Sequence, residues 1–267
     1  MFYDDGYVTR STVLDVAGTV HAFSTRLGGI STLPHTQSMN IAPGYGDSEE
    51  IIRKNTDLLA GFLGGFSVAD TVCAHQIHSA KVRVIDSSNR GEGTVTDAGE
   101  DCDGYVTATR GVVPMVRTAD CAPIILCAPR EGSTPVVAVL HAGWRGTVAD
   151  IAGEGVRKMM SFGVKTEDIR AAIGPHIGFC CFEVGEDLRD AVRSIRGADF
   201  ARRHIRENGT LHADLTGMNL ELLLEAGVLP EHMDASCECT FCLEEKYHSH
   251  RRGKGMRGTM GSLAAIL

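Results

Sequence analysis

The stretch Val136–Thr147 reads VVAVLHAGWRGT. It opens with a near-continuous apolar run, which is typical of a buried strand. A turn containing two glycines follows, and Thr147 then begins TVADIAGEGVRKMMSF, for which we expect a helix despite its own two glycines. Strand, glycine-containing turn and helix is a layout that presents side chains at the end of a strand. The segment therefore places His141 where a functional side chain is often found.

Helices and strands are predicted to be mixed along the rest of the chain. Further strands are expected where short runs are apolar or alternate in polarity, over residues 81–85, 112–116, 124–126 and 169–173. Helices are expected after the cap at Asp47-Ser48, ending at Gly64-Gly65, and over residues 186–195 and 214–226. The tail from Cys237 onward is rich in Cys, His, Arg and Gly, and we expect it to be irregular. No composition change marks a boundary, so residues 1–267 are predicted to form one domain.

The composition excludes several classes of protein. The chain has 26 Lys and Arg against 34 Asp and Glu, a net charge of −8, whereas a general nucleic-acid binder needs a basic face. No run approaches the ~18 apolar residues of a membrane-spanning helix. The start, MFYDDGYVTR, lacks the features of a secretory signal. Nine cysteines in a chain of this length therefore favour free, catalytic or metal-bound thiols in a reducing cytoplasm.

Three segments place metal-ligand side chains at predicted strand ends or turns: His75–His78, Asp120-Cys121 and the turn after His141. If residues 75–78 are extended, His75 and His78 point to opposite faces, and only Gln76 and His78 share one. Two histidines and a cysteine would suit zinc and leave a fourth position for water or substrate. The alternative is a core histidine, a buried thiol and a turn histidine that are each satisfied separately.

The order of short motifs along the chain resembles the laccase-domain family, also described as multicopper polyphenol oxidase-like or YfiH-type. The resemblance runs from about residue 20 to the C-terminus, and the blocks ADCAPI and HAGWRG are its most specific parts. The motifs are STRLGG (24–29), SMNI (38–41), QIH (76–78), DCAPI (120–124), HAGWRG (141–146), IGP (173–175), CCFEVG (180–185), CT (239–240) and SHRR (249–252).

This resemblance implies an α+β fold, a single domain of mixed β-sheets with flanking helices. It also implies a metal, usually zinc, held by His78, Cys121 and His141, which would be the catalytic residues. The chemistry implied is phosphorolysis of adenosine, inosine or methylthioadenosine and deamination of adenosine. The family's older label is copper-dependent oxidation of phenols. A single site of two histidines and one cysteine favours a redox-inert Lewis acid, so zinc is preferred, with copper as an alternative occupant.

Substrate contacts are predicted from the chemistry that purine nucleosides and phosphate require. Arg26 and Arg145 each lie near glycine-rich backbone, where a guanidinium can bind phosphate, although each would equally serve in a surface ion pair. Asn40 and Gln76 are candidates for the ribose or base, and Cys180 for a further substrate contact. Asp103, Asp120 and Glu183 are candidates for acid–base chemistry, none favoured over the others. Trp144 would stack on a base or anchor packing.

Other interpretations remain open from the sequence. Cys121 and His141 would also suit a cysteine hydrolase or deamidase, with any metal adventitious. A copper-dependent polyphenol oxidase and a non-enzymatic binding module are further alternatives. Cys237, Cys239 and Cys242 with His248 and His250 suggest a second metal site, although the family pattern implies none there. No residue reports on a protein partner or on the oligomeric state.

Overall fold

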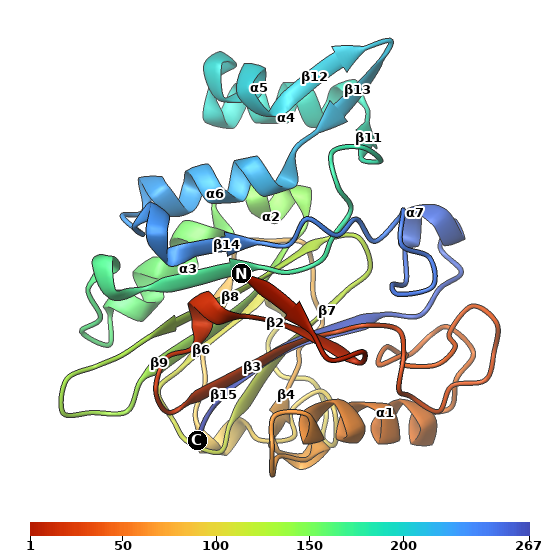
Figure 1. The fold of residues 1–267 in the computed structure, drawn as a ribbon, viewed down its shortest axis with the longest axis vertical. Coiled ribbons are helices and arrows are strands. Elements are labelled where there is room, and N and C mark those ends of the chain that lie inside the picture. Colours follow the sequence, from red (N-terminus) through yellow and green to blue (C-terminus); the bar gives the residue numbers. More distant parts are fainter.

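The computed structural model describes residues 1–267. Its centre is a pair of six-stranded sheets, and a small three-stranded sheet lies at one end of the molecule (Figure 1). The first sheet is antiparallel except at β4, which pairs in parallel with β7. Its strand order is β1 (Phe2–Asp4), β2 (Val8–Ser11), β3 (Thr19–Ser24), β15 (Met260–Ile266), β7 (Val113–Thr118) and β4 (Thr71–Val72).

The second sheet has parallel pairs at both edges and antiparallel pairs between them. Its order is β14 (Met233–Ala235), β10 (Arg170–Ile173), β8 (Ala122–Ala128), β9 (Val136–Ala142), β6 (Gly104–Thr107) and β5 (Val82–Val84). The small sheet has the order β11 (Glu183–Val184), β13 (Thr210–Ala213) and β12 (Ile205–Asn208).

The helices lie outside the two large sheets (Figure 1). Helix α1 (Glu49–Gly61) covers the first sheet, and α2 (Trp144–Val148), α3 (Ile151–Met160) and α6 (Leu215–Glu225) lie on the second. Helices α4 (Glu186–Arg196) and α5 (Ala198–His204) lie beside the small sheet, and α7 (His250–Gly253) is a single turn. None of these helices is both long and apolar enough to cross a membrane.

Alternate residues of each central strand serve different hydrophobic layers. On β9, Ala138 and Leu140 face the helices, whereas Val137 and Val139 join a cluster that contains residues of both sheets. A third cluster lies between the first sheet and α1, through Leu59. Because both faces of β8 and β9 are covered, every residue of these strands is buried. The burial of both faces explains why the sequences of these strands are nearly continuously apolar. The mixed sheets with helices outside them confirm the predicted α+β fold.

The predicted strands correspond to β5, β7, β8, β9 and β10, and the predicted helices to α1, α4 and α6. Ser48 caps α1 as expected, with its hydroxyl accepting a hydrogen bond from the amide of Ile51 at 3.4 Å. Two expectations are wrong. The helix predicted from Thr147 starts at Trp144 and is divided at Asp150, which has φ 70° and caps α3 through its side chain. The tail is not irregular throughout, because it contains α7 and ends in the central strand β15.

Candidate active site

A pocket of about 450 Å³ opens where loops from both large sheets meet. Its walls come from the loop before β5, the β7–β8 turn, the β9–α2 junction, the loop before β11, and the segment from α7 to β15. The volume lies within the range of small-molecule sites, roughly 300–1,000 Å³. This is the setting in which the candidate ligands lie.

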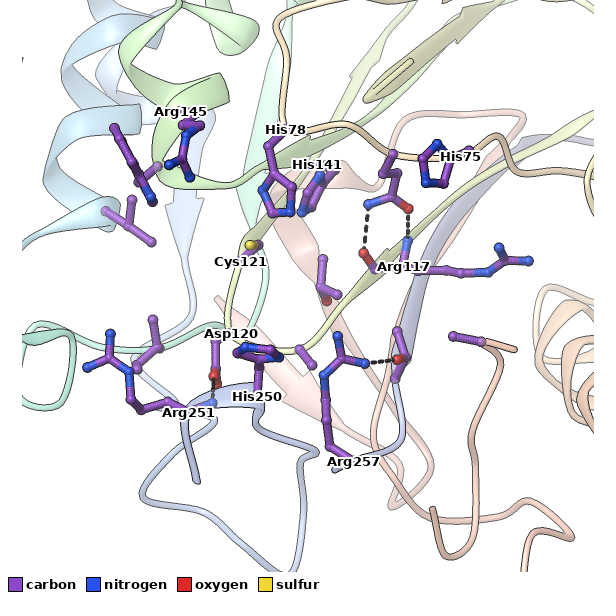
Figure 2. Close-up of a pocket in the computed structure, with 18 of the residues that line it drawn as sticks. His75, His78, Arg117, Asp120, Cys121, His141, Arg145, His250, Arg251 and Arg257 are labelled. Atoms are coloured by element: carbon purple, nitrogen blue, oxygen red, sulfur yellow. Dashed lines mark hydrogen bonds between the residues drawn. The ribbon is translucent and has the colours of Figure 1, made fainter. Parts of the chain in front are cut away.

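His78, Cys121 and His141 converge on one wall of this pocket (Figure 2). Their potential ligand atoms all lie within 4.8 Å of one another, and the two imidazole rings are 4.8 Å apart at 69°. Antiparallel pairing of β8 with β9 sets Ala122 opposite Ala142, so Cys121 lies next to the end of the strand that carries His141. His78 comes from the loop between β4 and β5. The opposite faces expected for His75 and His78 applied to an extended segment, whereas His78 has φ 60° and so is not extended.

The Asp103 carboxylate holds this arrangement together. It is completely buried and accepts a hydrogen bond from His141 Nδ1 at 2.8 Å. It also accepts the backbone amides of His78 at 2.9 Å and Ser79 at 2.6 Å. Burial raises the pKa of Asp103, but the hydrogen bonds from His141 and Ser79 outweigh burial and lower the pKa to about 2. Asp103 is therefore an anion that orients His141 with Nε2 free, the usual arrangement behind a metal-binding histidine.

The electrostatics of the pair Cys121 and His141 favour a thiolate. Burial raises the pKa of the Cys121 thiol, but the charge and hydrogen bond of His141, followed by those of His78, lower it to about 6. Burial lowers the pKa of His141, whereas Cys121 and Asp103 raise it to about 9. Thiolates are both the nucleophilic and the metal-ligating form of cysteine. The pair is therefore suited to either role.

The residues present fit a zinc ion. Two imidazoles and a thiolate are a zinc donor set that leaves one position for water or substrate. Gly143 leaves the space beside these donors open, since a Cβ built on it would lie 2.5 Å from His78 Nδ1 and 3.2 Å from Cys121 Sγ. Any other residue at 143 would crowd both donors.

The pocket also contains four arginines that form no ion pair. Arg117, Arg145, Arg251 and Arg257 line the pocket, whereas the ion pairs made by arginines lie elsewhere in the molecule. The Nε atoms of Arg117 and Arg257 are buried without any hydrogen-bond partner. The single carboxylate in the lining is that of Asp120. The pocket is therefore cationic in a chain of net charge −8, which favours anionic ligands.

Two of the predicted substrate residues lie away from this pocket. Arg26 donates to the carbonyl oxygens of Gln37 at 2.9 Å and Glu244 at 3.0 Å, and therefore holds loops together. Asn40 is fully buried. Its Nδ2 donates to the Asp47 carboxylate at 2.8 Å, and its Oδ1 accepts a hydrogen bond from the amide of Thr259. Neither side chain belongs to the lining. The cations available to a ligand are instead the four arginines.

The other predicted substrate residues have different surroundings. Gln76 lines the pocket, but its amide group is occupied by the backbone of Arg117, at 2.8 and 2.7 Å. Arg145 also lines it, with its guanidinium 4.1 Å from the ring centre of Trp144. Trp144 is thus a pocket wall with one face covered. Cys180 is exposed and outside the lining, among other cysteines.

Of the three carboxylates considered for acid–base chemistry, two are occupied by hydrogen bonds within the protein and one lies outside the pocket. Asp103 is buried and fully bonded, as described above. Asp120 accepts hydrogen bonds from Thr240 Oγ1 at 2.7 Å and Ser249 Oγ at 3.0 Å. It also accepts one from the amide of Arg251 at 2.7 Å (Figure 2). Glu183 is exposed on β11 and outside the lining. The pocket lining also contains the imidazoles of His75 and His250, beside those of His78 and His141.

Sequence reasoning did not single out Arg117, Arg251 or Arg257 as pocket residues. Arg117 did carry a signal, since it is the one charged residue in the apolar strand VPMVRT. Arg251 lies in the SHRR motif, but nothing local indicated that it or Arg257 faces the pocket, because their position depends on the route of the chain from α7 into β15.

Comparison with known proteins shows a family and close structural neighbours. The family described as "Multi-copper polyphenol oxidoreductase laccase" matches residues 20–267. A protein of Geobacillus stearothermophilus named "Purine nucleoside phosphorylase YlmD" is 36% identical, over 91% of this chain and 89% of that protein. One from an unknown prokaryotic organism, named "Adenosine deaminase RL5", is 36% identical over 87% of this chain and 88% of its own length.

The fold matches solved structures over its full length. The crystal structure of the Bacillus licheniformis hypothetical protein YfiH superposes with a TM-score of 0.90 at 27% identity, covering 100% of this chain and 99% of the other. The similarity in fold therefore extends over both large sheets.

Proposed function

Because the chain belongs to the multi-copper polyphenol oxidoreductase laccase family, we propose that it is a zinc-dependent purine nucleoside enzyme. Its reactions would be phosphorolysis of adenosine, inosine or methylthioadenosine and deamination of adenosine. Relatives named as a purine nucleoside phosphorylase and an adenosine deaminase support these two kinds of reaction. The observation that carries this proposal is a single pocket that combines the donor group His78, Cys121 and His141 with four arginines that lack ion pairs. Copper is an alternative occupant.

Phosphorolysis needs a phosphate held beside the ribose. The bond from the anomeric carbon to the base nitrogen breaks, and a bond from that carbon to a phosphate oxygen forms. The pocket arginines supply the charge for this step, because a guanidinium binds phosphate oxygens in bidentate fashion. Arg257 has a buried Nε without a partner, and Arg117 shares this property. Both Nε–H groups would gain a hydrogen-bond acceptor when an oxyanion binds in the pocket.

The apolar side of the pocket suits the purine. Trp144, Ile177, Phe182 and Leu215 are among the apolar residues of its lining. The flat face of an aromatic ring can stack on a purine base. A bound zinc ion would supply a Lewis acid that polarises water or a substrate oxygen. The chain's own contribution is to hold His141 through Asp103 and to keep Cys121 as a thiolate.

One assay tests the proposal. Purified protein is incubated with adenosine, with and without phosphate, products are separated by chromatography, and bound metal is measured on the same sample. Adenine that forms only with phosphate reports phosphorolysis, and inosine that forms without it reports deamination. Both should follow bound zinc and be lost on chelation and in Cys121→Ala, His78→Ala and His141→Ala alike. A folded, zinc-loaded sample that catalyses neither reaction would overturn the proposal.

A cysteine hydrolase is a second candidate, because Asp103, His141 and Cys121 form a chain in which a carboxylate orients an imidazole that contacts a thiolate. Such an enzyme should survive chelation, tolerate His78→Ala and be blocked by alkylation at Cys121. The third alternative, a polyphenol oxidase, should require copper and consume oxygen. The donor groups contain two histidines in all, too few for the cluster of coppers that reduces oxygen by four electrons.

A further inference from the structure

Four cysteines outside the pocket lining lie together. Cys180 and Cys181 belong to the loop before β11, and Cys239 and Cys242 to the loop after β14. Their sulfur atoms all lie within 4.8 Å of one another, with Cys242 Sγ 3.8 Å from Cys180 and 3.4 Å from Cys181. All four are free thiols. They share no residue with the group of His78, Cys121 and His141.

The spacing of these sulfur atoms matches tetrahedral metal coordination. Zinc–sulfur bonds of about 2.3 Å in a tetrahedron place the sulfurs about 3.8 Å apart. A disulfide requires about 2.05 Å, much less than either separation above. Cys239 and Cys242 also have the two-residue spacing that is common in structural zinc sites.

The backbone around the cluster suits bound thiolates. The amide of Gly178 donates to Cys239 Sγ at 3.2 Å, and such bonds stabilise negative sulfur. A Cβ built on Gly178 would lie 3.2 Å from Cys239 Cβ and 3.3 Å from Cys180 Sγ, so the glycine lets the two loops approach. The amide of Thr240 also donates to the carbonyl of His176 at 3.0 Å and joins the same loops.

Both loops continue into walls of the pocket. Ile177 and Phe182 flank the first cysteine pair, and the chain beyond Cys242 leads to His250 and Arg251. Arg251 Nη2 donates to the carbonyl of Glu183 at 2.8 Å, the residue after Phe182. A metal at the cluster would therefore fix these two neighbouring wall segments of the pocket relative to each other.

We propose that Cys180, Cys181, Cys239 and Cys242 form a second metal site, a structural zinc tetrathiolate that joins these two loops. The four sulfurs fill all positions of a tetrahedral ion, so this site leaves no place for water or substrate. The sequence pattern alone suggested Cys237 and the histidines at 248 and 250 as partners. The structure instead supplies the adjacent pair, Cys180 and Cys181, and leaves Cys237 exposed and outside the cluster.

The test is metal stoichiometry of the full chain purified in reductant, measured by elemental mass spectrometry. Wild-type protein should carry two zinc ions, Cys242→Ser one, Cys121→Ala one, and the double variant none. Cys237→Ser is the matched control and should keep both ions, because it changes an exposed cysteine of the same segment. Zinc content in Cys242→Ser equal to that of the wild type would overturn the proposal.

X-ray absorption on Cys121→Ala provides a measurement that leaves the cluster intact. The remaining zinc should show four sulfur neighbours at about 2.3 Å. A mixed nitrogen and sulfur shell, or a Cys181–Cys242 disulfide in protein prepared without oxygen, would contradict a tetrathiolate. Loss of this site would not remove His78, Cys121 or His141, so failure here and failure of the nucleoside activity are separate results.

Discussion

The buried carboxylate of Asp103 orients His141 and the loop that carries His78. Its carboxylate receives His141 Nδ1 together with the amides of His78 and Ser79. We predict that Asp103→Asn lowers zinc affinity by about 10–100-fold, because the imidazole loses its orienting acceptor. Competition with a chromophoric chelator measures the change. Asp101→Asn, at a carboxylate whose side chain is 52% exposed, should leave affinity unchanged; equal losses in both variants would count against an orienting role.

Arg257 is predicted to bind the phosphate. Its Nε is buried and unpartnered, its ring neighbour Tyr45 is 4.5 Å away, and no carboxylate neutralises it. A hydrogen bond to a charged group contributes about 1.5–3 kcal/mol, so Arg257→Gln should lower kcat/KM for phosphate by about 10–100-fold. Deamination of adenosine needs no phosphate and should change much less. Arg110→Gln, at an exposed turn outside the pocket, is the control, and a parallel fall of both activities would contradict the assignment.

At the residue scale, the sequence indicated the histidine and cysteine group of the site but only one of the four pocket arginines. His78, Cys121 and His141 lie in short motifs whose residue types already limit the chemistry, and the structure brings these three together. Arg26 and Asn40 lie in motifs too, but their polar groups hold backbone in place. Local sequence cannot separate an arginine that binds a carbonyl from one that faces a cavity, since this depends on chain segments far away in sequence.

At the scale of elements, the strands β8 and β9 were predicted because both of their faces are buried and their sequences are therefore apolar. The strand β15 was missed because MGSLAAI contains small residues, and nothing nearby in the sequence shows that it lies between β3 and β7. Gly261 is required there, since a Cβ on it would lie 2.5 Å from Leu59 and 2.6 Å from Ile41. Pairing over such a sequence distance is set by packing and not by local preference.

The strand β3, next to β15, contains a histidine that makes the fold sensitive to acid. His21 is 3% exposed and accepts the amide of Ser11 through Nε2 at 3.0 Å. Burial, together with the charge of Arg10, lowers its pKa to about 4, whereas an unfolded histidine titrates near 6.5. The unfolded state therefore binds the extra proton between these values, and stability falls as pH drops from about 6.5 to about 4, by about 3 kcal/mol in all.

Urea unfolding at a series of pH values tests this prediction. His21→Gln keeps an acceptor for the amide of Ser11 but cannot be protonated, so its stability should fall less across that pH window than that of the wild type. His75→Gln should keep the wild-type slope, because the His75 side chain is 74% exposed. An unchanged slope in His21→Gln would show that His21 is not the group responsible.

At the scale of the whole molecule, the two sheets share one hydrophobic layer. Phe23, Val116 and Ala264 of the first sheet pack in the same cluster as Ile125 and Val139 of the second. Neither sheet can separate from the other without exposing this layer to water, which costs roughly 25 cal/mol per Å² of apolar surface. The pocket also takes its walls from segments of both. We therefore expect residues 1–267 to unfold as one unit.

Two probes placed in different layers can test this cooperativity. Trp144, the single tryptophan of the chain, lies in α2 over the second sheet, and its fluorescence reports on that side. Cys73 is buried with Leu59 and Met115 between α1 and the first sheet, and its labelling in urea, quantified by mass spectrometry, reports on the other. With zinc held at one saturating concentration, because bound metal shifts apparent stability, the two midpoints should coincide. Two separate midpoints would divide the chain into independently folding parts, and the shared layer would then contribute less to stability than its burial indicates.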